Sequence, residues 1–118
     1  MGFSHERLDV YNQAIEFTAW SQSLVDKLPT HASTRSQLER ASTSIPLNIA
    51  EGNAKSSRKD RARFWRIALG STLECAAILD VLVARRTKAR DEVADGKESL
   101  ERIASMLIGL LKILETRR

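Results

Sequence analysis

Cysteine, histidine and glycine are scarce in this chain of 118 residues, and the shortage excludes several classes of protein. The single cysteine, Cys75, cannot form an internal disulfide, and its apolar neighbours favour a packed thiol over a reactive one. The histidines, His5 and His31, lie far apart, and neither belongs to a Glu-x-x-His pair of the kind that builds metal centres in helical bundles. Phosphate-cradling glycine loops, nucleophile elbows and Cys/His ligand sets are missing too. The sequence predicts a protein that is not an enzyme and uses no cofactor or metal.

The sequence also shows neither long hydrophobic runs nor a targeting signal. We find no apolar run that approaches the about 20 residues of a membrane span. Residues 1–6 have neither a basic start nor a hydrophobic signal region. A length of 118 residues with 42% hydrophobic side chains suffices for one core of useful size. We therefore expect one cytoplasmic domain over residues 1–118, without membrane association.

Apolar residues recur at three- and four-residue steps in four segments, and the two-residue alternation of strands is absent. The segments cover about residues 6–27, 35–52, 57–86 and 91–116. The polar connections are too short to run back along a helix of about 35 Å, which favours antiparallel neighbours. The predicted fold is an all-α, antiparallel up-down-up-down four-helix bundle.

The third and fourth segments carry more apolar positions than a narrow core-facing seam requires. We therefore expect some of these residues to lie outside the monomer core and to form a homo-oligomer. The alternative, that they only widen the internal core, stays open.

Residues 44–52 place a proline inside a helical hydrophobic pattern and follow it with a glycine. An interior proline costs about 3 kcal/mol because it removes a backbone hydrogen bond, so tertiary packing must hold Pro46. Gly52 is predicted to end this helix in the left-handed conformation. Gly70 is predicted to permit close contact between two helices.

Four polar residues lie near the apolar faces of the second and third helices: Asn48, Glu51, Ser71 and Glu74. A buried polar group without a partner costs about 1 to 3 kcal/mol, so we predict a cross-helix hydrogen-bond network. In this network Glu51 or Glu74 pairs with one of the nearby arginines, Arg40, Arg63 or Arg66. The alternative is a catalytic carboxylate pair. These four residues complete the predicted structural motif with Ser44, Pro46, Gly52 and Gly70.

Positive charge gathers around the connection between the second and third helices. The net charge is +4, and this group consists of Lys55, Arg58, Lys59, Arg61, Arg63 and Arg66, which the bundle brings to the same end as Arg117 and Arg118. Their combined field is expected to hold nucleic-acid phosphates, with Trp65 placed to stack on a base. The alternatives are a solvated charged face and a tryptophan used for packing. A second basic group at the other end, Arg85, Arg86, Lys88 and Arg90, complements a helix dipole or forms a second phosphate patch.

Several motifs also carry a resemblance to a known family. They are QLERASTSIPLNIAEG at residues 37–52, SRKD at 57–60, RF at 63–64 and IALGSTLEC at 67–75. The chain resembles the four-helix bundle proteins encoded by intervening sequences of bacterial large-subunit ribosomal RNA genes. That resemblance implies a cyclic homo-oligomer, a pentamer of antiparallel bundles. A related branch, the accessory variability determinant of diversity-generating retroelements, implies nucleic acid and a reverse transcriptase as partners. Glu39 departs from the family, which often has arginine there, and removes a positive charge.

Two functional hypotheses follow. The first is a non-enzymatic oligomeric adaptor that binds structured RNA or DNA through phosphate contacts. The second is a protein-interaction scaffold that docks another polypeptide on its outer helical surface, without nucleic acid. A small-molecule pocket at the centre of the oligomer is a third possibility.

Overall fold

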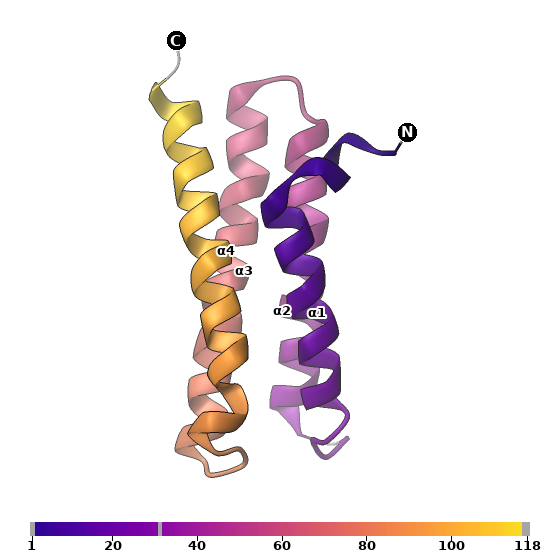
Figure 1. Ribbon diagram of the computed structural model, residues 1–118, viewed down its shortest axis with the longest axis vertical. Helices are drawn as coiled ribbons and strands as arrows, with labels where there is room; N and C mark the ends of the chain where they lie inside the picture. The colour runs from indigo at the N-terminus through magenta and orange to yellow at the C-terminus, as the bar shows by residue number, and fades with distance from the viewer. Residues whose placement is uncertain (1, 31, 117–118) are drawn as a thin grey trace.

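Four α-helices and one short 3₁₀ helix form the computed structural model, which describes residues 2–30 and 32–116 (Figure 1). The elements are η1 (Ser4–Arg7), α1 (Asp9–Val25), α2 (Ser33–Ala54), α3 (Arg58–Ala84) and α4 (Arg90–Thr116). The described residues include no strand. The prediction of an all-α fold of four helices is confirmed, and the helices differ from the predicted segments only at their ends.

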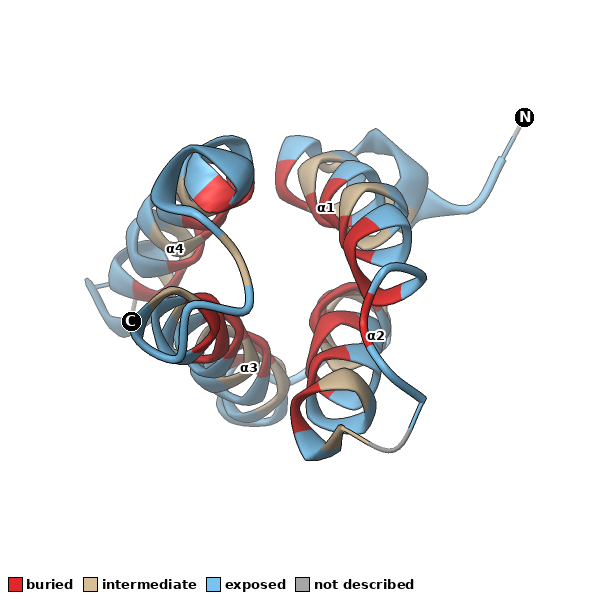
Figure 2. Ribbon diagram, turned by 90° about the horizontal axis from the view of Figure 1, so that it is seen from below, coloured by how far each residue is buried: buried red, intermediate tan, exposed pale blue. Residues whose placement is uncertain are grey.

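Each long helix packs against two others in the order α1, α2, α3, α4 and back to α1. Because α1 and α3 lie diagonally across the bundle, the outer sides of these two helices face different directions (Figure 2). The α2–α3 connection, η1 and the last turns of α4 lie at one end of the bundle (Figure 1). The α1–α2 and α3–α4 connections lie at the other end. The sequence-distant basic residues near the start of α3 are therefore close to the end of α4.

The buried residues of all four helices lie on the sides of the ribbons that face one shared interior (Figure 2). Phe17 of α1, Ile45 of α2, Leu79 of α3 and Ile103 of α4 are among the largest that are fully buried. Removing such side chains from water contributes about 1.5 to 3 kcal/mol each. The helical spacing of apolar residues is therefore what closes the bundle.

The α2 helix runs through Pro46 without ending. Pro46 is buried, and it leaves the Ser42 carbonyl without its usual helical donor. The Thr18 hydroxyl of α1 lies 3.5 Å from that carbonyl and 2.9 Å from the Ala14 carbonyl of its own helix, so it is placed to donate to either. Packing against α1 thus holds the proline in the helix, as the sequence predicts.

Gly52 does not end α2, and that prediction is wrong. The helix continues to Ala54, and no described glycine has a positive φ. A Cβ atom at Gly52 would lie 2.6 Å from the Cδ1 atom of Trp65. The glycine is needed because the indole of α3 crosses the α2 backbone at this point.

Gly70 does not sit at a helix contact, so that prediction is also wrong. It is exposed, and a Cβ atom built there meets nothing within 4 Å. Close approach occurs instead at Gly96 of α4, where a Cβ atom would lie 2.3 Å from the ring of Trp20. The absent side chain at Gly70 leaves the outer side of α3 open.

The α3 helix begins and ends through specific backbone contacts. The Ser57 hydroxyl oxygen accepts a hydrogen bond of 3.1 Å from the Asp60 amide, which is the predicted N-cap. At the other end Arg86 adopts a left-handed φ of 59°, and the Thr87 amide donates to the Leu82 carbonyl at 3.0 Å. A non-glycine residue in this conformation costs about 1 kcal/mol.

By length and composition, α3 could also cross a membrane, which corrects the expectation that no segment is apolar enough. In the described residues it alone meets this test, and 33% of its 18-residue apolar window is buried. The core helix of a soluble protein passes the same test, so this is weak evidence for a membrane span. The firm result is that much apolar surface of α3 is left outside the core.

Candidate nucleic-acid interface

The predicted basic group lies on the α2–α3 connection and the first turns of α3. Arg58, Lys59, Arg63 and Arg66 are exposed, whereas Lys55 and Arg61 are half-buried. Arg58 and Lys59 occupy the first turn, directly after the Ser57 cap. Arg117 and Arg118 lie outside the described residues. The structure thus brings six of the eight predicted phosphate ligands to one end of the bundle.

The helix dipole disfavours cations in the first turn of a helix. The N-terminus of a helix carries a partial positive charge, so a cation there is unfavourable by about 0.3 to 1 kcal/mol. Arg58 and Lys59 stand at such a position, accompanied by one acid, Asp60. Their arrangement raises the positive potential at the end of the bundle, where an anion would be favoured by both the side chains and the helix dipole.

Arg61 differs from its neighbours because its guanidinium group caps α2. Its Nη2 atom donates to the carbonyls of Asn53 at 3.1 Å and Lys55 at 2.9 Å, and its Nε donates to Gly52 at 3.3 Å. These carbonyls lie at the C-terminal end of α2, where helical donors run out. Arg61 therefore has a structural role that competes with the predicted phosphate contact.

Two other predicted ligands take part in exposed ion pairs. Arg66 Nη2 lies 3.4 Å from Glu115 Oε1 of α4, and Lys55 Nζ lies 3.1 Å from Glu51 Oε2. Pairs of this kind contribute about 0 to 1 kcal/mol, so a phosphate group can replace the carboxylate at little cost. The remaining cation, Arg63, lies over the ring of Phe64 with 5.0 Å between its Cζ atom and the ring centroid.

Trp65 does not face solvent, so the prediction that it stacks on a base is wrong. The side chain is 4% exposed, and its Nε1 atom donates to the Ile49 carbonyl of α2 at 3.1 Å. The packing alternative is the correct one. Arg61 lies over the buried Trp65 ring, and Lys55 and Arg63 lie over the half-buried ring of Phe64. The sequence places Phe64 next to Trp65, but helical spacing alone does not say which ring is buried.

The cross-helix network of the structural motif is present. Ser71 of α3 donates to the Ser44 hydroxyl of α2 at 2.8 Å, and Asn48 Nδ2 donates to the same hydroxyl at 3.0 Å. Arg40 Nη2 pairs with Glu74 Oε2 at 3.1 Å, which is one of the predicted pairs. Glu51 does not pair with α3: its carboxylate pairs with Lys55, directly after the end of α2, so Glu74 is the carboxylate that makes the predicted cross-helix pair.

Cys75 is buried at the centre of α3. Burial, with a smaller effect of the nearby Glu74 carboxylate, raises the pKa of its thiol to about 12. The thiol is therefore protonated at neutral pH and packs as a small apolar group, which agrees with the sequence. The described residues contain no group of three or more His, Cys, Asp or Glu side chains that could hold a metal ion.

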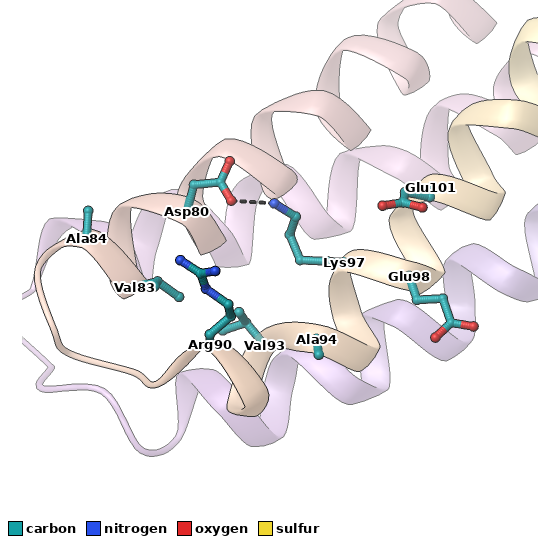
Figure 3. A pocket seen from close by; sticks show the side chains of 9 residues that line it. All are labelled: Asp80, Val83, Ala84, Arg90, Val93, Ala94, Lys97, Glu98 and Glu101. Atoms are coloured by element: carbon teal, nitrogen blue, oxygen red, sulfur yellow. Dashed lines mark hydrogen bonds and ion pairs between the residues drawn. The ribbon is translucent and has the colours of Figure 1, made fainter.

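The second basic group does not form a comparable patch. Lys88 is half-buried with its Nζ 3.9 Å from Glu92, while Arg85 and Arg86 follow the C-terminus of α3, where the dipole favours cations. Arg90 points into a groove of about 740 Å³ between α3 and α4, beside the Asp80–Lys97 ion pair (Figure 3). The groove also contains Glu98 and Glu101, so its charges are mixed (Figure 3). The dipole interpretation therefore fits Arg85 and Arg86, which follow α3, but not Arg90, which begins α4.

Comparison with known proteins identifies the family of this chain. The model of the family described as 23S rRNA-intervening sequence protein matches residues 6–109. A solved structure of a protein with unknown function from the S23 ribosomal protein family of Bacteroides thetaiotaomicron is 25% identical, with a TM-score of 0.83. The match covers 87% of this chain and 98% of that one. No curated protein matches the chain. The family match covers three helices, most of α4 and the proline-containing motif, so the chain belongs to the 23S rRNA-intervening sequence protein family.

Proposed function

We propose that this protein is a cytoplasmic, non-enzymatic adaptor: an antiparallel bundle, one domain over residues 1–118, that assembles into a cyclic homo-oligomer and binds structured RNA or DNA through phosphates. The observation that carries the proposal is the placement of Arg58 and Lys59 in the first turn of α3. Both are exposed, and both oppose the helix dipole. A phosphate ligand there would be favoured both by the two cations and by the N-terminal end of the helix dipole.

The expected mode of binding is contact with the nucleic-acid backbone. The cations lie at one end of the bundle, on a connection and the first turns of one helix. Backbone contacts are independent of sequence and depend strongly on salt. A cyclic assembly would repeat the cationic tip around a ring and multiply its avidity.

The direct test is charge reversal in the full-length protein. The double variant Arg58→Glu with Lys59→Glu should lose at least tenfold in affinity for a structured RNA or DNA. The control is Arg85→Glu, an exposed cation at the other end of the bundle, which should bind within about twofold of wild type. Equal affinity of the double variant and wild type, or no binding by wild type, would refute the proposal.

The exposed apolar side of α3 favours a second candidate, a scaffold that docks another polypeptide. The resemblance implies a reverse transcriptase as one such partner. This candidate expects copurification that survives nuclease and is lost when Leu73 is changed to Asp. Copurification that nuclease abolishes would instead support nucleic-acid binding.

A further inference from the structure

Phe3 has the most exposed large apolar side chain of the described residues, at 73%. It is also the one aromatic residue among the exposed large apolar side chains of residues 2–30 and 32–116. Single exposed apolar side chains are normal on a protein surface, so exposure alone does not indicate a site. Phe3 stands out because its ring is held in place and lies beside the cations of the candidate interface.

Contacts with η1 and α1 hold the ring of Phe3. It stacks on the imidazole of His5, with 5.8 Å between the ring centroids and an angle of 12° between the planes. His5 in turn makes an edge-to-face contact with Tyr11 of α1, at 4.6 Å between centroids. The Phe3 amide donates to Glu6 Oε1 at 3.0 Å. The protein therefore backs one face of the ring, and at 73% exposure a second planar group can stack on the face away from His5.

A hydrogen bond ties η1 to the basic end of the bundle. Asn53 Nδ2, in the last turn of α2, donates to the Ser4 hydroxyl at 2.7 Å, and the Asn53 carbonyl accepts from Arg61 Nη2 at 3.1 Å. From Asn53 to Arg58 the backbone spans at most about 18 Å. One strand of a duplex advances about 3.4 Å per nucleotide, so a few nucleotides cover this distance. Phe3, next to Ser4, and the cations can therefore contact the same strand at this end of the bundle (Figure 1).

We propose that the open face of Phe3 stacks on an unpaired base of the nucleic acid whose phosphates bind at the start of α3. This inference rests on the proposed function and adds to it the class of nucleic acid. In a duplex the faces of the bases are covered by the neighbouring base pairs, so a surface ring stacks on bases in loops, bulges, ends or single strands. The ligand is therefore a single-stranded segment, or a structured RNA or DNA that presents one.

The charges around Phe3 separate the place for a base from the place for phosphates. The carboxylate of Glu6, which accepts from the Phe3 amide, disfavours a phosphate directly at the ring. The exposed cations Arg58 and Lys59 stand at the start of α3. A bound strand thus lays its backbone on α3 and turns a base toward η1. Proteins that bind single strands combine cations along the backbone with aromatic rings for the bases in this way.

The aromatic residues within the basic group are less suited to this contact. Trp65 is 4% exposed, and the half-buried ring of Phe64 lies beneath Lys55 and Arg63. The sequence points to Trp65 because it stands among the cations, whereas Phe3 is distant from them along the chain. Only the fold brings Phe3 to the basic end, through the hydrogen bond between η1 and α2.

The test measures the affinity of the full-length protein for three strands of about ten nucleotides: an oligouridylate, an oligodeoxythymidylate and an abasic strand with the same number of phosphates. Stacking on one base changes affinity by roughly 5- to 100-fold, so Phe3→Ala should lose that factor on the strands with bases. On the abasic strand it should bind within about twofold of wild type. Comparison of the two strands with bases separates RNA from DNA, which differ in the 2′-hydroxyl.

Matched variants separate the flat ring from apolar bulk. Phe3→Tyr should keep the wild-type affinity, whereas Phe3→Leu, which is apolar without an aromatic face, should lose about as much as Phe3→Ala. The remote control is Leu47→Ala, an apolar side chain of α2 that is 63% exposed, and it should bind within about twofold of wild type. The Phe3 variants should keep the salt dependence of wild type, because they lose no phosphate contact.

Different results refute the stacking and the phosphate function. Equal affinity of Phe3→Ala and wild type for both strands with bases, while Arg58→Glu with Lys59→Glu binds about tenfold more weakly, refutes the stacking alone. An equal loss by Phe3→Ala on the abasic strand also refutes it, because no base is involved. A loss by Phe3→Ala on the strands with bases, with wild-type affinity in the charge-reversed double variant, refutes the phosphate function at α3 alone. A wild-type protein that binds none of the strands refutes both.

Discussion

Arg61 offers the clearest test of how the basic end is built, because the structure gives it three acceptors in one place. The change is Arg61→Ala, which removes the donors to the carbonyls of Gly52, Asn53 and Lys55. These carbonyls end α2 and have few other partners. If Arg61 is a cap, its loss must weaken the whole bundle.

The expected loss can be estimated from the contacts. Hydrogen bonds from a charged donor contribute about 1.5 to 3 kcal/mol when strong, and a cation at a helix C-terminus adds about 0.3 to 1 kcal/mol. One of the three bonds is long at 3.3 Å, and the side chain is only half-buried, so water replaces part of the interaction. We expect the free energy of unfolding to fall by about 2 to 3 kcal/mol, which lowers Tm by roughly 10 °C in a domain of this size.

The assay is urea unfolding followed by circular dichroism at 222 nm, with Arg63→Ala as the control. Arg63 is exposed and its guanidinium group lies over the Phe64 ring, so its loss should cost less than about 1 kcal/mol. Arg61→Lys keeps the charge but cannot reach three carbonyls, and should lie between wild type and Arg61→Ala. A decrease in the free energy of unfolding below about 0.5 kcal/mol for Arg61→Ala would show that water satisfies the carbonyls equally well. Arg61 would then be assigned to phosphate binding, as the sequence predicts.

Three further predictions concern single positions. Gly52→Ala should destabilise the bundle by about 1 to 3 kcal/mol in urea unfolding, because the added Cβ atom meets the Trp65 ring at 2.6 Å; an unchanged midpoint would contradict this contact. Arg86→Gly should raise the free energy of unfolding by about 0.5 to 1 kcal/mol by relieving the positive φ, whereas a loss of stability would mean that the arginine side chain contributes more than the strain. The Cys75 thiol, with a pKa near 12 against 9.0 when unperturbed, should resist a thiol reagent at pH 8. Since the unfolded thiol ionises first, Cys75 should make stability fall as pH rises from about 9 to 12, a dependence that Cys75→Ala should lack.

The sequence predicts the helices well, because apolar spacing follows directly from packing around one core. Pro46 is the most demanding case: the apolar spacing around it predicts a helix, and α2 runs through it. The prediction for Gly52 is wrong because a glycine needed for close approach and a glycine needed for positive φ look the same in a sequence. Only the position of Trp65 on the neighbouring helix distinguishes them.

The candidate site is harder to predict, because six cations of one kind stand within twelve residues. Nothing local distinguishes Arg61, which caps α2, from Lys59, which faces solvent. The apolar character of α3 was, in contrast, visible in the sequence, since residues 67–84 contain only two charges, Glu74 and Asp80. The average hydropathy of residues 67–84 therefore identifies α3 as an apolar helix.

The central claim is that the cationic start of α3 binds nucleic-acid phosphates, and the dependence of affinity on salt tests it most directly. The logarithm of the binding constant for a duplex should fall linearly with the logarithm of the salt concentration. Each phosphate contact contributes a slope of about −0.9, so Arg58→Glu with Lys59→Glu should make the slope shallower by roughly two. Binding that does not change between low and high salt, or an identical slope for this double variant, would contradict the account.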